Sequence, residues 1–371
     1  MSKNIYVTRP YLPPLTEFQT YLEQIWDNGI LTNNGPIHQQ LEAALAGALE
    51  VDHLSLFNNG TVALVTALQA LGLEPGAEVI TTPFSFVATS HALMWNGLTP
   101  VFADIEPTNL NLDPTRIEAA ITPRTQAILP VHCYGNPCDT AALQAIADRH
   151  GLKVIYDAAH AFGVRDAGGS VLRHGDFSVL SFHATKVFNT LEGGAIISPD
   201  AETKHRIDRL KNFGIVSETE VECVGINGKM NEVQAAFGLL QLNNIDAALA
   251  ARGRVAARYR AALQDVAGIT AVPLAGQNVA NHAYFPILVD PAYPLDRDGL
   301  YDALRRENIY ARRYFFPLIA NLPMYADYPS AVPANLPQAN RLADQVLCLP
   351  IYPDLGEDDV ERILDVVRGA Q

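Results

Sequence analysis

The sequence predicts an α/β protein built on a mainly parallel sheet. Short apolar runs alternate with helical patterns from about residue 37 to residue 200, and this alternation is typical of a parallel sheet with helices on both faces. In addition, one run ends in an acid and another is followed by a lysine, as expected where strands deliver functional side chains to the carboxyl edge of such a sheet. We therefore expect a three-layer large domain and a smaller α+β domain at the C-terminus.

Seven apolar runs are expected to form the strands of the large sheet. They cover residues 53–57, 78–81, 100–104, 127–132, 153–157, 177–182 and 195–198. Several of the segments between them have the apolar periodicity of helices. These helical segments are residues 61–72, 114–121 and 139–150.

A long helical pattern covers residues 231–265, and we expect it to bend near Asp246. Three further elements are predicted after it, a strand at 284–289 and helices at 296–307 and 357–368. A unit of roughly 120 residues has the size of a separate domain. The predicted boundaries are 15–245 for the large domain and 246–371 for the small domain, with residues 1–14 as an arm near the substrate and the small domain.

Composition limits the classes of function. The chain has 371 residues, is 49% hydrophobic and 18% charged, and carries a formal net charge of −14. Such an acidic surface argues against nucleic acid and anionic membranes as partners, although a local cluster of cations would still bind a nucleotide-linked substrate. No apolar run approaches the roughly 18 residues of a membrane span, and residues 1–10 lack a signal-peptide core.

The four cysteines are too few and too scattered for a disulfide framework. They are Cys133, Cys138, Cys223 and Cys348. Two of them lie near His132, but the spacing matches no common zinc pattern. We therefore expect no metal, and cysteines that pack as small hydrophobic side chains in a reducing cytoplasm.

The residues at the ends of two predicted strands are the most informative about function. Residues 153–157 end in Asp157, and residues 177–182 are followed by Lys186. These are the two groups that pyridoxal phosphate needs, since the lysine forms a Schiff base and the acid keeps the pyridinium nitrogen protonated. Taken alone, Lys186 would be interpreted as a surface lysine and Asp157 as a helix N-cap. The pair is more informative than either residue.

The segment Asn58-Asn59-Gly60-Thr61 meets another need of this cofactor, a site for its phosphate. It follows an apolar strand and opens a helix, and helix N-termini bind anions through their backbone amides. Gly60 lets the backbone approach the phosphate, and the hydroxyl of Thr61 can donate to it. An ordinary capped turn is the alternative interpretation of this segment.

Eight short motifs along the chain are weak individually but specific in their order and spacing. They are Asn59-Gly60-Thr61, Thr82 to Thr89, Val131 to Gly135, Asp157 to His160, Ser181 to Lys186, Gly225 to Met230, Gln234 to Ala236 and Leu349 to Pro353. With these motifs the chain resembles, essentially end to end, the DegT/StrS group of sugar aminotransferases. This group belongs to the aspartate aminotransferase superfamily (fold type I) of pyridoxal phosphate enzymes. The resemblance implies a large domain with seven strands.

The resemblance also implies roles around the cofactor. Lys186 bonds to the cofactor and later carries a proton between it and the substrate, while Asp157 pairs with the pyridinium nitrogen. His160 stands where the family more often has glutamine and should donate to the phenolate oxygen, and Phe86 should stack on the ring. A surface histidine and a core phenylalanine are the alternatives for these two.

The phosphate of the cofactor is expected to bind Gly60, Thr61 and Ser181. Asn227 resembles a family asparagine that reaches the phosphate from the partner subunit, which implies a homodimer with shared active sites. Lys229 lies nearby and would meet phosphate or substrate. A loop turn and a solvated charge are the alternatives for Asn227 and Lys229.

The implied substrates are L-glutamate as amino donor and a nucleotide-linked ketosugar, most often a 6-deoxyhexos-4-ulose, as acceptor. Asn33 lies in a segment that approaches the sugar in relatives. Arg312, Arg313 and Tyr314 lie in a loop that relatives use near the nucleotide. Guanidinium groups suit a diphosphate, and two solvated arginines are the alternative.

His183, within the motif that ends in Lys186, resembles family members that aminate carbon 4 of the hexose. The continuation Phe188-Asn189-Thr190 resembles the branch that makes dTDP-4-amino-4,6-dideoxyglucose. We therefore expect His183 at the substrate and dTDP-4-keto-6-deoxyglucose as the acceptor. Amination of carbon 3, UDP- or GDP-linked sugars, and the pathway (O-antigen or lipopolysaccharide biosynthesis among others) are left open.

Three other classes of protein are disfavoured. A ketosugar dehydratase of the same fold would have histidine in place of Lys186. A regulator without turnover would not need Lys186 and Asp157 together with a phosphate site. A nicotinamide enzyme would need G-x-G-x-x-G after the first strand, and the chain has no such motif there.

Overall fold

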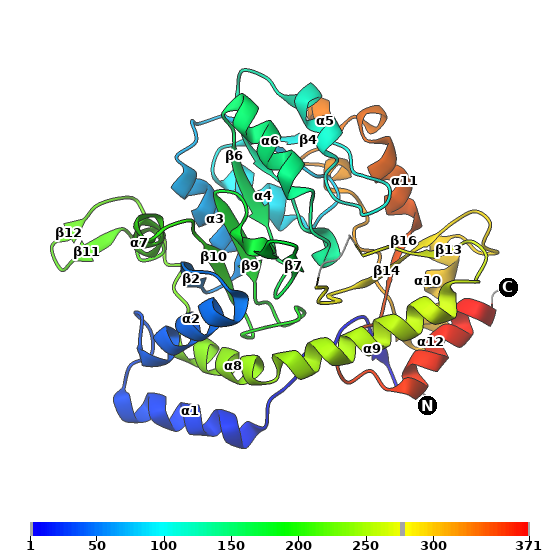
Figure 1. The fold of residues 1–371 in the computed structure, drawn as a ribbon, viewed down its shortest axis with the longest axis horizontal. Helices are drawn as coiled ribbons and strands as arrows, with labels where there is room; N and C mark the ends of the chain where they lie inside the picture. The colour runs from blue at the N-terminus through cyan, green and yellow to red at the C-terminus, as the bar shows by residue number, and fades with distance from the viewer. Residues whose placement is uncertain (1–2, 275–278, 370–371) are drawn as a thin grey trace.

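A seven-stranded sheet lies at the centre of the large part of the molecule (Figure 1). The computed structural model describes residues 3–274 and 279–369. The strands are β2 (Leu54–Phe57), β3 (Glu78–Thr81), β4 (Thr99–Phe102), β5 (Thr125–Leu129), β6 (Lys153–Asp157), β9 (Phe177–Ser181) and β10 (Gly194–Ile197). Their order is β2-β10-β9-β6-β5-β3-β4, in which β10 is antiparallel to both neighbours and the other pairs are parallel. Each strand overlaps its predicted range, so the predicted sheet is confirmed.

Helices cover both faces of this sheet. On one face, α3 (Gly60–Leu71) packs against β9 and β10 and beside α4 (Ala88–Trp95) and α7 (Ala201–Leu210). On the other face lie α2 (Pro36–Leu49) and α8 (Glu232–Asn243). Successive side chains of a strand point to opposite faces of the sheet, so each strand contributes to the core on both faces. Val179 and Ile196 belong to the core beneath α3, and Leu180 and Ala195 belong to the core beneath α2.

Two helical predictions differ in detail from the structure. The predicted helix 114–121 is a short α5 (Pro114–Ile117) followed by a single 3₁₀ turn, Glu118–Ala120, whereas α6 (Thr140–His150) lies where it was predicted. The long pattern is divided into α8 and α9 (Ile245–Leu263) at Asn244, which has the non-helical φ of −108° and ψ of 2°. This break is close to the bend predicted at Asp246.

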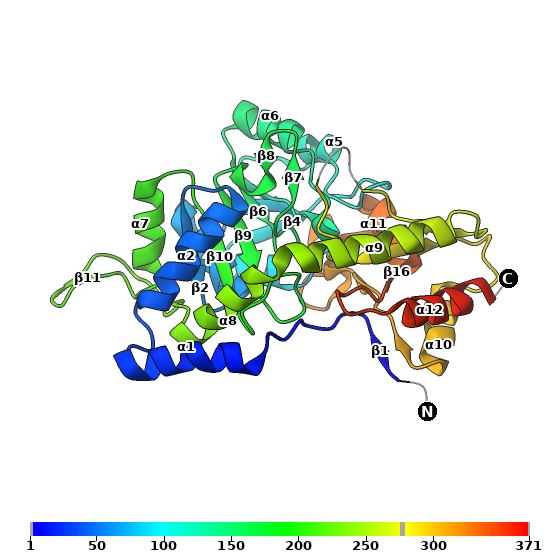
Figure 2. The same cartoon turned by 60° about the horizontal axis from the view of Figure 1, so that its bottom comes forward.

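The C-terminal elements form a second, smaller α+β unit (Figure 2). Its antiparallel sheet has the order β13-β14-β16. The elements are β13 (Ile269–Ala271), β14 (Phe285–Val289), α10 (Arg297–Arg306), β15 (Ile309–Tyr310), α11 (Pro337–Gln345), β16 (Val346–Leu349) and α12 (Glu357–Gly369). The arm before α1 joins this unit, because β1 (Ile5–Tyr6) pairs in parallel with β15. The predicted fold class is thus confirmed.

Several elements were not predicted. Besides α4, α7 and α11, they include α1 (Leu15–Asn28) and two hairpins, β7 (Arg165–Asp166) with β8 (Gly169–Ser170) and β11 (Ile215–Ser217) with β12 (Glu220–Val221). The β11–β12 hairpin projects from the body at the left of Figure 1. None of the helices within residues 3–274 and 279–369 is both long and apolar enough to span a membrane.

Candidate active site

A cavity of about 660 Å³ lies at the carboxyl ends of β6 and β9, next to the N-terminus of α3. Nine residues predicted for the site line this cavity: Gly60, Thr61, Phe86, Asp157, His160, Ser181, His183, Lys186 and Tyr314. They come from five separate segments of the chain. The parallel sheet brings four of these to one edge, and Tyr314 approaches from the C-terminal part of the chain.

Lys186 extends from the loop after β9 into the cavity. Its Nζ is 3.5 Å from the hydroxyl of Tyr284 and 5.9 Å from the centre of that ring. Burial lowers the pKa of Lys186 to about 8, while the charge of Asp157 acts in the opposite direction. An amine with this pKa is partly neutral near physiological pH, so it can serve both as a nucleophile and as a proton carrier.

Asp157 ends β6 and is only 5% exposed. Its Oδ2 accepts a hydrogen bond from the hydroxyl of Thr89 at 2.7 Å, and its Oδ1 accepts one from the backbone N–H of Ala159 at 3.1 Å. Burial nevertheless raises the pKa of Asp157, because its effect exceeds that of these hydrogen bonds and of the charge of Lys186, which lower the pKa. A buried carboxylate in this position is therefore suited to pair with a cationic atom of a ligand.

His160 is buried and presents one defined donor to the cavity. The backbone N–H of Tyr134 donates to its Nδ1 at 3.3 Å, so the ring proton must lie on Nε2. Burial, followed by the charge of Lys186, lowers the pKa of His160 well below its ordinary value. The ring stacks on Phe315 at 5.9 Å and meets the edge of Tyr284 at 4.9 Å. His160 is thus a neutral, fixed hydrogen-bond donor.

The N-terminus of α3 lies against the end of β9 and is suited to bind an anion. Asn59 caps the helix by accepting from the backbone N–H of Val62 at 2.8 Å. A Cβ on Gly60 would lie 2.8 Å from the Cβ of Ser181, so only glycine allows this close approach. Together with the hydroxyls of Thr61 and Ser181, the helix offers backbone donors and its dipole to a phosphate.

The cavity fits pyridoxal phosphate. The α3 N-terminus suits the phosphate, Asp157 a pyridinium nitrogen, His160 a phenolate oxygen and Lys186 an aldehyde carbon. Phe86 lines the cavity with 58% of its surface exposed, which leaves its ring available for stacking on an aromatic ligand.

Five residues predicted for the site do not line the cavity: Asn33, Asn227, Lys229, Arg312 and Arg313. Arg313 is ion-paired with Asp298 at 2.8 Å, and its guanidinium lies 4.4 Å from the centre of the Tyr301 ring. Asn227 is exposed, and its backbone carbonyl accepts from the side chain of Asn58 at 3.3 Å. The binding roles of all five stay predictions.

Among the residues without a predicted role, Glu192 and Tyr284 line the cavity, and Thr89 donates to Asp157. Thr89 belongs to a motif that the sequence singled out, and its hydroxyl is 2.9 Å from that of Ser85. Ser85 lies in the bend before α4 and Thr89 in the first turn of that helix, so a helical pattern in the sequence does not reveal their contact. Tyr284 comes from the C-terminal unit, and no local pattern reveals that it approaches Lys186. Phe315, which follows Tyr314 in the loop predicted near the nucleotide, also lines the cavity.

Fold and site define an α/β enzyme that binds pyridoxal phosphate. The chain belongs to the DegT/DnrJ/EryC1/StrS aminotransferase family, which it matches over residues 15–368. The expectations of an aminotransferase and of pyridoxal phosphate as its cofactor are thereby confirmed.

Individual relatives are similar along nearly their whole length. The dTDP-4-amino-4,6-dideoxy-D-glucose transaminase of Shigella dysenteriae is 57% identical over 368 residues, which cover 99% of both chains. The structure of DesI in the presence of its TDP-sugar product has a TM-score of 0.93 at 38% identity, over 99% of this chain and 93% of that chain. NtdA from Bacillus subtilis with bound cofactor PMP has a TM-score of 0.87 at 31% identity, over 96% and 81%.

Proposed function

We propose that the protein transfers the amino group of L-glutamate to carbon 4 of dTDP-4-keto-6-deoxyglucose, which gives dTDP-4-amino-4,6-dideoxyglucose. The observation that carries this proposal is the 57% identity, over 99% of both chains, to a transaminase named for that product. The presence of Lys186, Asp157 and the α3 phosphate site in one cavity supports it. His183, which also lines this cavity, supports carbon 4 rather than carbon 3 as the site of amination.

We propose a separate role in this reaction for each of four residues that line the cavity. When bound, pyridoxal phosphate supplies an electron sink for the carbon from which a proton is removed. Asp157 would hold the proton on the pyridinium nitrogen, and His160 would donate to the phenolate oxygen through Nε2–H. The Nζ of Lys186, whose pKa is lowered to about 8, would accept and return the proton at the reacting carbon. Tyr284 touches Nζ and orients it.

We further propose that two subunits share their active sites. The support is a set of exposed apolar side chains on and beside the β11–β12 hairpin. Monomers rarely expose so many apolar side chains in one segment. They are Phe213, Ile215, Val216, Val221, Val224 and Ile226. Asn227 directly follows this surface, so a second subunit that covers the hairpin would also meet Asn227 and Lys229.

The proposed boundary between the two domains is at residue 245. It is supported by the break at Asn244 and by the separate cores on either side of it. Ala235 and Ala236 of α8 pack in the core of the large sheet, whereas Val255 and Tyr259 of α9 pack in the core of the three-stranded sheet. We also propose a reducing, cytoplasmic location, because the four cysteines are free thiols.

A panel of acceptors tests the proposed reaction. Purified protein with L-glutamate is offered dTDP-, UDP- and GDP-linked 4-keto-6-deoxyhexoses and a dTDP-linked 3-ketosugar. We expect the highest kcat/KM with dTDP-4-keto-6-deoxyglucose. A preference for a UDP- or GDP-linked sugar, or for the 3-ketosugar, would replace the proposed acceptor by that one.

A further inference from the structure

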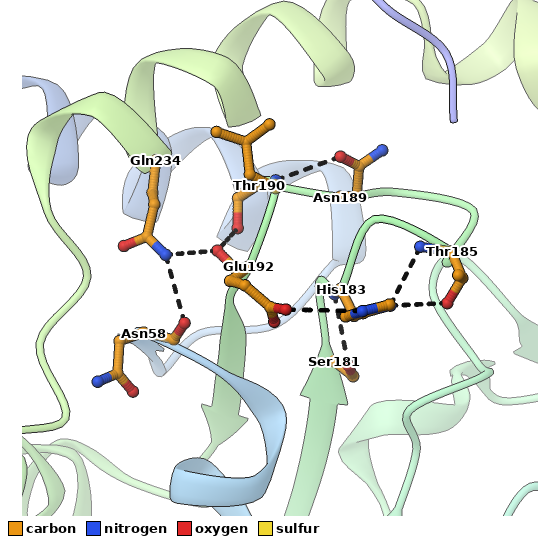
Figure 3. A network of polar contacts seen from close by, with 9 residues as sticks. Asn58, Ser181, His183, Thr185, Asn189, Thr190, Glu192 and Gln234 are labelled. Atoms are coloured by element: carbon orange, nitrogen blue, oxygen red, sulfur yellow. Dashed lines mark hydrogen bonds and ion pairs between the residues drawn. The ribbon is translucent and has the colours of Figure 1, made fainter. Parts of the chain in front are cut away.

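His183 and Glu192 face each other in the wall of the cavity that contains Lys186 (Figure 3). The Nε2 atom of His183 is 3.6 Å from Oε1 of Glu192, which is longer than a hydrogen bond. The side chains are 47% and 58% exposed. Both polar ends are therefore available to a ligand in the cavity, and the proposed transfer of the amino group assigns no role to Glu192.

The tautomer of His183 is fixed by its neighbour Thr185. The backbone N–H of Thr185 donates to Nδ1 of His183 at 3.2 Å, and the hydroxyl of Thr185 is 2.8 Å from the same atom. A ring nitrogen that accepts from a backbone N–H carries no proton, so the proton of the neutral ring lies on Nε2. This donor points toward the carboxylate of Glu192.

The backbone of Glu192 is held in place from two sides (Figure 3). Its carbonyl oxygen accepts from the hydroxyl of Thr190 and from the side-chain amide of Gln234, each at 2.7 Å. Gly193 packs so closely here that a Cβ would lie 1.9 Å from the hydroxyl oxygen of Thr190. The same amide of Gln234 reaches the carbonyl of Asn58 at 3.3 Å. Glu192 is thus tied to the segment that precedes the phosphate site.

We propose that His183 and Glu192 together bind one hydroxyl of the hexose, with Nε2–H of His183 as donor and the carboxylate of Glu192 as acceptor. A hydroxyl can accept one hydrogen bond and donate another, which is what this pair requires of its ligand. A ketone or a methyl group would satisfy at most one of the two. The pair therefore selects for a hydroxyl at this place in the sugar.

The position of the hydroxyl follows from that of the reacting carbon, so this step rests on the proposed function. The backbone N–H of Lys186 donates to the carbonyl of His183 at 2.8 Å, which closes a tight turn between the two residues. In a 4-keto-6-deoxyhexose, carbon 4 is flanked by carbon 3, which carries a hydroxyl, and by carbon 5, which carries the methyl group. Because His183 and Glu192 line the same cavity as Lys186, we assign their ligand as the hydroxyl of carbon 3, the hydroxyl-bearing neighbour of the reacting carbon.

The test compares dTDP-4-keto-6-deoxyglucose with its 2-deoxy and 3-deoxy analogues, using wild-type protein, Glu192→Ala and Glu118→Ala. Glu118 is a matched control, since it also faces a histidine (His150, Nε2 to Oε1 3.3 Å) but lies outside the cavity. We expect kcat/KM of the wild type to fall about 10- to 100-fold for the 3-deoxy analogue, the range for a lost charge-assisted hydrogen bond, and to change little for the 2-deoxy analogue.

Glu192→Ala is expected to lower kcat/KM for the natural sugar by a similar factor, with no further loss for the 3-deoxy analogue. Calorimetric affinity for the aminated product should fall in parallel. The half-reaction with glutamate, followed in the visible spectrum of the cofactor, should stay unchanged and report an intact site.

Equal kcat/KM of the wild type for the 3-deoxy and natural sugars would overturn the inference, as would a loss confined to the 2-deoxy analogue. The same holds if Glu192→Ala lowers kcat/KM equally for both sugars. A wild-type protein that aminates none of the 4-ketosugars would instead refute the proposed function, and this inference with it.

Discussion

At the scale of single residues, burial sets the properties of Lys186 and Asp157, the two groups proposed to be catalytic. It lowers the pKa of Lys186 to about 8 and raises that of Asp157, so each group is shifted toward its neutral form. The first shift makes the amine available as a nucleophile. The second leaves a carboxylate whose charge is best stabilised by a cationic ligand.

The pKa of Lys186 predicts how cofactor uptake depends on pH. Below about pH 8 the amine is mostly protonated and cannot attack the aldehyde of pyridoxal phosphate. The rate of uptake by cofactor-free protein should therefore fall about tenfold per pH unit below that value and level off above it. Stopped-flow absorbance in the visible measures this rate, with Lys186→Ala as a control that shows no covalent uptake. A rate that is constant from pH 6 to pH 9 would contradict the assignment.

Asp157→Asn is expected to retain the cofactor but to lose at least about two orders of magnitude in turnover, because an amide cannot hold the pyridine nitrogen in its protonated, electron-withdrawing form. The amide can still accept from Thr89, which now bonds Oδ2, so the fold should survive. Steady-state kinetics and cofactor content check this expectation. Normal turnover would mean that another acid serves the nitrogen.

Some residues of the candidate site can be located from the sequence alone. Asp157 and Ser181 end strands that are buried and hydrogen-bonded in the central sheet, so apolar runs alone locate them. Tyr284 could not be found in the same way. It meets Lys186 only because two separately encoded units of the chain pack together.

At the scale of elements, a buried acid joins two helices. Glu232, at the start of α8, is fully buried and accepts from the backbone N–H groups of Ile37 and His38 at 2.9 and 2.8 Å. It thereby caps α2, whose own N-cap residue Gly35 has no side chain to do so. A Cβ on Gly35 would lie 2.6 Å from this carboxyl group.

Removal of this cap should destabilise the protein. Glu232→Ala leaves two buried N–H groups without partners and is expected to lower the free energy of unfolding by about 2–3 kcal/mol. Glu232→Gln keeps an acceptor oxygen and should cost less. Denaturant titration measures both, with Glu23→Ala on the exposed face of α1 as control. A loss for Glu232→Ala no larger than that of the control would show that the cap is unimportant.

Element boundaries that depend on distant contacts escape prediction from sequence. The N-terminus of α11 has no side-chain cap of its own. It is satisfied by Asp104, which accepts from the backbone N–H groups of Gln338 and Ala339 at 2.9 and 2.8 Å. The seven strands of the central sheet, in contrast, are signalled by their own apolar residues.

At the scale of the whole molecule, the proposed dimer gives a role to two predicted site residues that do not line the cavity of their own subunit. Asn227 and Lys229 do not line the cavity of their own chain, and they follow an apolar hairpin surface that projects from the body (Figure 1). If this surface meets a second copy, each active site is assembled from two chains.

Complementation tests the shared site. Lys186→Ala and Asn227→Asp are each expected to be inactive or weak, the second because it sets another negative charge against the phosphate. Mixed after unfolding and refolding together, they should regain at most about a quarter of wild-type activity, since about half of the dimers are heterodimers and each has one intact site. Mixtures that never recover activity, or a fully active monomer in sedimentation, would rule the shared site out.

The position of the transferred nitrogen in the product defines the proposed reaction. Wild-type protein is incubated with ¹⁵N-labelled L-glutamate and dTDP-4-keto-6-deoxyglucose, and the sugar product is analysed by NMR. We predict that ¹⁵N is bonded to carbon 4 of the hexose and that Lys186→Ala yields no labelled sugar. Label on another carbon, or labelled product from Lys186→Ala at the wild-type rate, would contradict the proposed reaction.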